Sequence, residues 1–217
     1  MIKSTTYLLD RGWIVNFRPG EDPSSPLIIA LHGWTGTELS MHAFHYQIPS
    51  EYSILSPRGT IPAEPTGYGW VHKTGQSRDW EIITQRLHSE IDEWLRFFNL
   101  KPKSRALLGF SQGGALVYSM CSTAPEIYRT AAVLAGFLPS HLIENINQHN
   151  LSTLKIYIAH GSNDDVIKVE SARKAARLCQ AAGAAVTYCE SDFGHKLSAG
   201  CAKGLQEFFL SALQQTN

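Results

Sequence analysis

The stretch "RALLGFSQGGALVYSM", residues 105–120, decides the fold. An apolar run leads into Gly-Phe-Ser-Gln-Gly at 109–113, and a helix-like segment follows at once. A G-x-S-x-G turn between a strand and a helix holds its serine in a strained conformation and exposes the hydroxyl at the top of a sheet. Gly109 and Gly113 let the strand and the helix approach closely. Ser111 is therefore predicted as a nucleophile, and an ordinary serine in a tight turn is the alternative.

Around this motif, apolar runs alternate with helical patterns. Two short antiparallel strands are predicted within 6–17, followed by strands at 26–33, 52–59, 105–110, 130–136, 154–161 and 184–192. Helices are predicted at 80–98, capped by Ser77 or Asp79, at 168–182 and from about 198 onward. This alternation indicates an α/β fold with a mostly parallel sheet, helices on both faces and an antiparallel N-terminal hairpin at one edge. We expect a single domain, residues 1–217.

Composition excludes several classes of protein. Hydrophobic residues make up 43% and charged residues 18%, as in ordinary globular domains, and 19 basic residues balance 19 acidic ones. We therefore expect neither nucleic-acid binding nor attraction to a membrane surface. There is no apolar signal segment before Asp10 and no run of about 20 apolar residues, so no membrane span is expected.

The four cysteines form no C-x-x-C pair; they are Cys121, Cys179, Cys189 and Cys201. We expect buried free thiols in a reducing compartment rather than a disulfide framework or a zinc site, which indicates a cytoplasmic location. Neither H-E-x-x-H nor G-x-x-x-x-G-K-[ST] occurs in the chain. No metal and no cofactor are therefore expected.

Partners for Ser111 are sought at the carboxyl ends of the parallel strands, where sites gather in such sheets. The sequences at these ends include "LHGWTG" (31–36), "AHGSNDDVI" (159–167) and "SDFGHKLS" (191–198). They offer an acid and a histidine after the serine, in the chain order Ser, Asp, His that α/β-hydrolases use.

His195, in a loop before the last helix, is the predicted general base. His32 and His160 are its rivals, and we expect both to bond loop backbone instead. The acid that orients the imidazole is either Asp164 or Asp165, the other being a turn residue.

Asp192 is a weaker rival for the acid. The oxyanion of an acyl-transfer intermediate needs two backbone donors, predicted as the N–H groups of Trp34 and Gln112. The walls of the substrate site are predicted from the loops 57–75 and 137–150. Their aromatic residues Tyr68, Trp70 and Phe137 are candidates for substrate contact, with packing into the core as the alternative for Trp70 and Tyr68.

Taken together, "LHGWTG", "SPRG", "GYGW", "GFSQGG", "HGSNDDVI" and "FGHKLS" resemble, in order and spacing, the phospholipase/carboxylesterase family of α/β-hydrolases. The resemblance runs from residue 27 to about 210. It implies a Ser111, Asp164, His195 triad with Trp34 and Gln112 as the oxyanion hole, although Asp165 stands where the family usually has proline. No cap domain is expected in a chain of this length.

The function expected from these residues is that of a serine hydrolase. It would cleave carboxylic esters of small or medium acyl groups through an acyl-serine intermediate. An acyl thioesterase or lysophospholipase with the same triad is the main alternative. A peptidase, an acyltransferase and an inactive binding protein that keeps the fold are further ones. The expected partner is a small-molecule ester or thioester, and a homodimer is an open alternative to the monomer.

Overall fold

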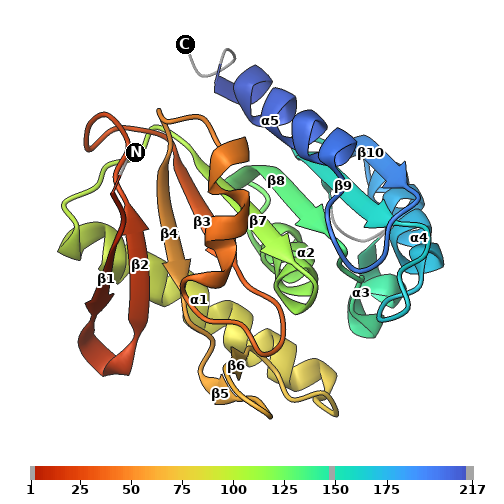
Figure 1. The fold of residues 1–217 in the computed structure, drawn as a ribbon, viewed down its shortest axis with the longest axis horizontal. Helices are drawn as coiled ribbons and strands as arrows, with labels where there is room; N and C mark the ends of the chain where they lie inside the picture. Colours follow the sequence, from red (N-terminus) through yellow and green to blue (C-terminus); the bar gives the residue numbers. More distant parts are fainter. Residues whose placement is uncertain (1–2, 147–149, 214–217) are drawn as a thin grey trace.

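A computed structural model describes residues 3–146 and 150–213 of the chain. Its centre is an eight-stranded sheet in the order β1-β2-β4-β3-β7-β8-β9-β10 (Figure 1). The neighbouring strands from β4 to β10 run parallel, and β2 runs antiparallel to both β1 and β4. The strands are β1 Thr5–Leu8, β2 Ile14–Arg18, β3 Leu27–Leu31, β4 Ser53–Pro57, β7 Arg105–Phe110, β8 Tyr128–Leu134, β9 Lys155–Gly161 and β10 Ala185–Ser191.

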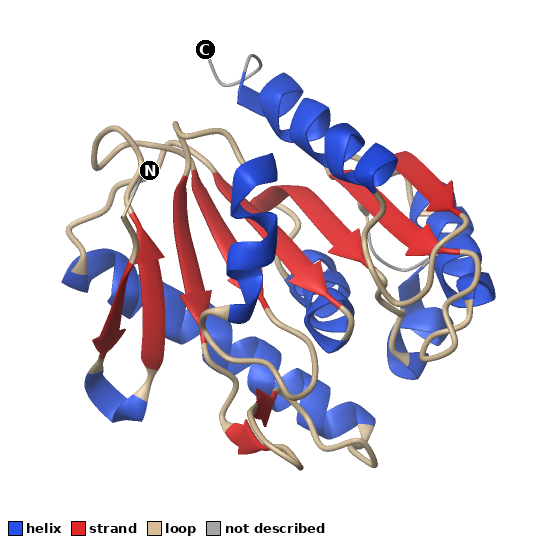
Figure 2. Ribbon diagram, viewed as in Figure 1, coloured by secondary structure: helices blue, strands red, loops and turns tan. Residues whose placement is uncertain are grey.

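Helices cover both faces of this sheet, as predicted (Figure 2). One face packs against α1, α2 and α4, and the other packs against α5 and the 3-10 helix η2. Strand β3 shows why its apolar run is continuous, because Leu27, Ile29 and Leu31 enter one core while Ile28 and Ala30 enter the other. The helices are η1 Asp10–Gly12, η2 Ser40–Gln47, α1 Ser77–Phe97, α2 Gln112–Thr123, α3 Ser140–Asn145, α4 Val169–Ala181 and α5 Ala199–Leu213.

Three connections hold structure that the sequence did not predict. The segment 40–47 forms η2, and the loop 57–75 contains a small hairpin of β5 (Ile61–Pro62) and β6 (Tyr68–Gly69). The predicted loop 137–150 contains α3, and its residues 147–149 lie outside the described part of the chain. At the start of α1 the Asp79 carboxylate accepts the backbone N–H of Gln76 at 2.7 Å, so Asp79 does take part in the cap.

The expectation of four free thiols is wrong for two of the cysteines. Cys189 in β10 and Cys201 in α5 form a disulfide, because α5 packs back against the end of the sheet and brings their Cα atoms to 5.8 Å. Cys121 and Cys179 are free and buried, as predicted. The disulfide closes a loop that contains His195. Within the described ranges, no helix is long and apolar enough to cross a membrane.

Candidate active site

Strand register brings the predicted site residues to one edge of the sheet. Leu31 at the end of β3 pairs with Gly109, one residue before the end of β7, which places the "LHGWTG" loop beside Ser111. Gly161 at the end of β9 pairs with Ser191 at the end of β10. The acid and histidine loops therefore begin side by side, as the sequences at the strand ends predict.

Ser111 occupies the strained turn expected of a G-x-S-x-G motif. Its backbone has φ 54° and ψ −117°, and it stands directly before the first residue of α2. The turn depends on its glycines, because a Cβ at Gly113 would collide with the carbonyl of Leu31 and one at Gly109 with the carbonyl of Gly113. The Ser111 side chain thus lies at the N-terminal end of a helix, where negative charge is stabilised.

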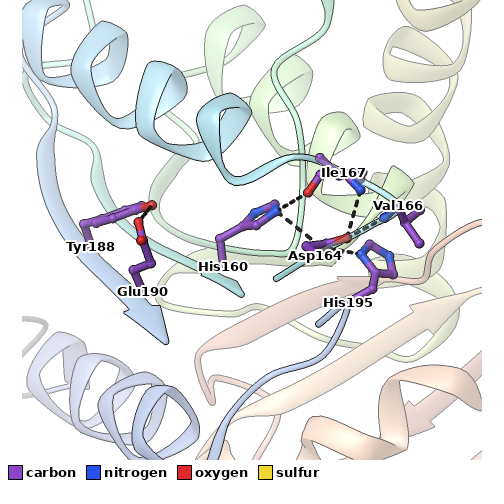
Figure 3. Close-up of polar contacts among 7 residues, drawn as sticks. All are labelled: His160, Asp164, Val166, Ile167, Tyr188, Glu190 and His195. Carbon is purple, nitrogen blue, oxygen red and sulfur yellow. Dashed lines mark hydrogen bonds and ion pairs between the residues drawn. The ribbon is translucent and has the colours of Figure 1, made fainter. Parts of the chain in front are cut away.

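Asp164 and His195 form a close pair (Figure 3). His195 Nδ1 lies 2.7 Å from Asp164 Oδ2, and the Oδ1 atom accepts the backbone N–H groups of Val166 and Ile167, both at 2.9 Å. Asp164 is buried and Asp165 is exposed. Of the two aspartates that the sequence left open, the structure therefore brings Asp164 to the histidine.

The pKa of Asp164 is set by opposing effects. Burial acts to raise it, but the Ile167 N–H, the hydrogen bond with His195 and the Val166 N–H together hold the pKa below the ordinary value of an aspartate. Asp164 therefore carries a negative charge at neutral pH. A buried carboxylate beside an imidazole stabilises the imidazolium that forms when the ring takes up a proton.

The acid and histidine loops are joined by backbone hydrogen bonds. The N–H of Asn163 donates to Phe193 O at 2.9 Å, and the N–H of Ser162 donates to Ser191 O at 2.8 Å. Asn163 also bonds the side chain of Asp192, so this rival acid is engaged away from His195. These contacts fix the Asp164–His195 pair as one unit.

His195 approaches the nucleophile turn through Phe110, the residue before Ser111. The two rings lie 5.0 Å apart. Among the described residues, no hydrogen bond joins Ser111 to His195. Such contacts often tighten only when substrate is bound.

The rival histidines bond the backbone, as predicted. His32 is fully buried; its Nδ1 lies 2.7 Å from Gly33 O, and its Nε2 accepts the N–H of Gly59 at 2.8 Å. His160 Nε2 donates to Ile167 O at 2.8 Å and lies 3.3 Å from Asp164 Oδ2. His160 therefore supports the acid loop.

The two predicted oxyanion donors have no competing acceptor. Gln112 is the first residue of α2, so its N–H has no partner within the helix. Trp34 lies in the turn after β3, and a Cβ on the neighbouring Gly33 would stand only 3.1 Å from the Ser111 Cβ. Within the described chain, neither backbone N–H has a hydrogen-bond partner. Both are free to bind a negative oxygen.

A cavity of about 530 Å³ opens beside His195. One wall comes from η2, through Ala43, Phe44 and Gln47. Ser40 of η2 also lines this side. The remaining lining comes from the Trp34 loop, from Phe110, from the loop before α5 and from α5 itself; its residues are Gly33, Trp34, Thr35, Gly36, Phe110, His195, Lys196, Leu197 and Ala202. Most of these contribute apolar surface, which suits an acyl chain.

None of the three aromatic residues predicted to contact substrate lines this cavity. Trp70 is 1% exposed and packs in the core, which was its alternative role. Tyr68 lies under the Arg58 guanidinium, and the Phe137 ring contacts Trp80. The wall from η2 could not be predicted, because a short 3-10 helix gives no clear apolar period. The lining residues with a sequence signal are Trp34 and His195, from the predicted site, and Phe110, next to the nucleophile.

No set of three or more His, Cys, Asp or Glu side chains in the described residues could hold a metal ion.

Comparisons with known proteins show which family the chain is similar to. The profile of the phospholipase/carboxylesterase family matches residues 15–210. The chain is 28% identical over 157 residues to the bifunctional acetylxylan esterase/xylanase XynS20E of Neocallimastix patriciarum, a match covering 68% of this chain and 20% of that protein. It is 21% identical over 193 residues to the putative hydrolase MhqD of Bacillus subtilis, covering 88% and 95%.

Among solved structures, the carboxylesterase of Bacillus cereus superposes with a TM-score of 0.81 at 22% identity, over 94% of this chain and 96% of that one. This likeness shows the α/β-hydrolase fold. With the family profile covering most of the sequence, the chain belongs to the phospholipase/carboxylesterase family and is a carboxylesterase-type enzyme.

Proposed function

We propose that this protein hydrolyses carboxylic esters of short or medium acyl groups through an acyl-Ser111 intermediate. The observation that carries the proposal is the hydrogen bond of 2.7 Å between His195 and the buried Asp164, together with a serine held in the strained turn before α2. Asp164 holds the His195 proton on Nδ1, which leaves Nε2 free to accept the proton of the Ser111 hydroxyl.

In the first half of the reaction the Ser111 oxygen attacks the carbonyl carbon of the ester, and its proton passes to His195. The N–H groups of Trp34 and Gln112 stabilise the negative oxygen of the tetrahedral intermediate. When this intermediate collapses, the proton on His195 passes to the departing alcohol. A water molecule then repeats the sequence on the acyl-serine and releases the carboxylic acid.

The size of the acyl group is inferred from the cavity. Its volume of about 530 Å³ and its apolar wall from η2 suit a short or medium chain. An apolar cavity would accept the acyl part of an oxygen ester or of a thioester, so a thioesterase or lysophospholipase is the alternative. A panel of nitrophenyl esters and acyl thioesters of graded length separates these activities.

The test of the nucleophile is Ser111→Ala. We expect this variant to lose both hydrolysis and labelling by a fluorophosphonate probe while its thermal unfolding stays close to that of the parent. Ser119→Ala is the matched control, because Ser119 is a buried serine of α2, the helix that Ser111 precedes, and its hydroxyl bonds Ala115 O. Esterase activity retained by Ser111→Ala would refute the proposed function.

Location and assembly remain predictions. Free, buried Cys121 and Cys179 fit the cytoplasm, whereas a disulfide such as Cys189–Cys201 is more typical of oxidising compartments. Fractionation of the native host with an antibody decides between them. A small-molecule substrate and no nucleic-acid partner are expected, and light scattering distinguishes a homodimer from a monomer.

A further inference from the structure

Trp70 connects the two backbone segments that supply the proposed oxyanion donors. Its backbone N–H donates to Gln112 Oε1 at 2.8 Å, and its indole Nε1–H donates to His32 O at 2.7 Å. The Gln112 amide completes the link by donating from Nε2 to Val71 O at 2.6 Å. Trp70, His32 and Gln112 are all buried. A dry hydrogen-bonded bridge therefore runs from the loop after β3 to the start of α2.

His32 extends this bridge to the residue next to Trp34. The Trp70 indole lies 4.9 Å from the His32 imidazole, measured between ring centres. Because Nε2 accepts the Gly59 N–H, the Nδ1 atom carries the proton and donates to Gly33 O. Burial lowers the pKa of His32 to about 4, so the neutral ring keeps this pattern at neutral pH.

Packing reinforces the same connection. A Cβ added at Gly69, directly before Trp70, would collide with the Trp34 ring and stand 3.0 Å from Gln112 Oε1. The segment 69–71 is therefore in contact with both donor residues at once. Trp70 belongs to the hydrophobic core and does not line the substrate cavity, so it acts on the site through these contacts and not by touching substrate.

We propose that Trp70 is a positioning residue that sets the spacing between the N–H groups of Trp34 and Gln112. This inference rests on the proposed function. Oxyanion donors act because they are already fixed where charge develops, and small displacements of such groups reduce turnover strongly. The indole N–H holds the His32 carbonyl and thereby the start of the Trp34 loop. The backbone N–H holds the Gln112 side chain and thereby the start of α2.

The test is Trp70→Phe, which removes the indole N–H and keeps an aromatic ring and the backbone N–H. Trp94→Phe is the matched control: Trp94 is 2% exposed, and its Nε1 has no hydrogen-bond partner among the described residues. Both variants lose the same volume from the core, but only Trp70→Phe loses a hydrogen bond to the donor loop.

For Trp70→Phe we expect kcat to fall by roughly 10- to 100-fold, less than the ~10²–10³ typical when an oxyanion donor is removed outright. KM should change by less than about threefold, since an interaction made only in the transition state leaves ground-state binding intact. A trifluoromethyl ketone, which forms a tetrahedral adduct with the serine, should bind more weakly by a similar factor. Trp94→Phe should leave kcat and this affinity unchanged.

A second variant covers the case in which Trp70→Phe does not fold. Gln112→Met keeps the backbone N–H and removes the amide that bonds Trp70 and Val71, so the same fall in kcat and in ketone affinity is expected. A folded variant of either kind with wild-type kcat and ketone affinity overturns the inference. A matching loss in Trp94→Phe also overturns it, and so does failure of both variants to fold, because the bridge would then serve stability alone. Activity in Ser111→Ala would instead refute the proposed function.

Discussion

Replacing Asp164 with asparagine tests how the acid and the imidazole cooperate. The carboxylate accepts the N–H groups of Val166 and Ile167 on one oxygen and His195 on the other. Asparagine offers one acceptor oxygen for these two sides. If that oxygen stays on the backbone donors, the amide NH₂ faces His195 Nδ1 and forces the ring proton onto Nε2. The imidazole can then no longer take the proton of Ser111.

The expected loss in kcat is on the order of 10⁴, as for other triads in which the orienting acid becomes an amide. This corresponds to about 5 kcal/mol of transition-state stabilisation. If the amide takes the flipped orientation instead, its NH₂ group faces the N–H groups of Val166 and Ile167. These buried donors are then left without an acceptor, which lowers the free energy of unfolding by about 1–3 kcal/mol. Asp165→Asn is the control. Because Asp165 is exposed, the kcat of this variant should differ from that of the parent by less than a few-fold.

Initial rates with nitrophenyl butyrate, and urea unfolding of each variant, separate the two effects. The reasoning is refuted if folded Asp164→Asn retains more than about a tenth of the parental kcat. It is also refuted if Asp165→Asn loses as much as Asp164→Asn, since His195 would then be oriented by the neighbouring aspartate.

Two further predictions concern acid stability and acyl-chain length. The folded-state pKa of His32 is about 4, below the ordinary value of about 6.5, so only the unfolded chain takes up this proton between the two values. The contribution of neutral His32 to the free energy of unfolding is complete above about pH 6.5 and is lost as pH falls toward 4, by roughly 3 kcal/mol. Urea unfolding of the parent and of His32→Gln across this range should show a smaller loss of stability in the variant. Phe44 lines the cavity wall and its ring lies 5.8 Å from that of Phe110. Phe44→Ala should therefore favour longer nitrophenyl esters, by up to about fourfold in kcat/KM for each added methylene. Tyr46→Ala, on the exposed side of η2, should leave the length preference unchanged. An unchanged length preference in Phe44→Ala would contradict the assignment of Phe44 to the cavity wall.

The parallel strands and the positions of the site residues could be predicted because burial leaves a clear mark on the sequence. A strand such as β3, buried on both faces, is a continuous apolar run, and its carboxyl end then points to the edge where sites gather. The choice between Asp164 and Asp165 was open, because both occupy one turn. It depends on which side chain faces the N–H groups of Val166 and Ile167, a matter of loop backbone that composition does not encode.

Other features depended on packing between distant segments. Trp70, an aromatic residue in a glycine-rich loop, was predicted to contact substrate, yet its polar atom is satisfied inside the protein by His32 O. The η2 segment has no clear apolar periodicity, and its position is set by packing against α5 and into the core on that face of the sheet. The Cys189–Cys201 bond likewise requires α5 to fold back on β10, which a sequence separation of 12 between the two cysteines does not specify.

The Cys189–Cys201 disulfide limits how far His195 can move out of the site. β10 has a partner on one side only and most of its side chains are accessible, and a strand of this kind is where a sheet opens first. Cys189 lies before His195 and Cys201 lies after it, so the disulfide closes a short loop that contains the imidazole. If the β9–β10 ladder opens, this loop limits how far His195 can move from α5. The return of His195 to Asp164 then orders only a short closed loop. Its entropic cost is smaller than that of closing a long free loop.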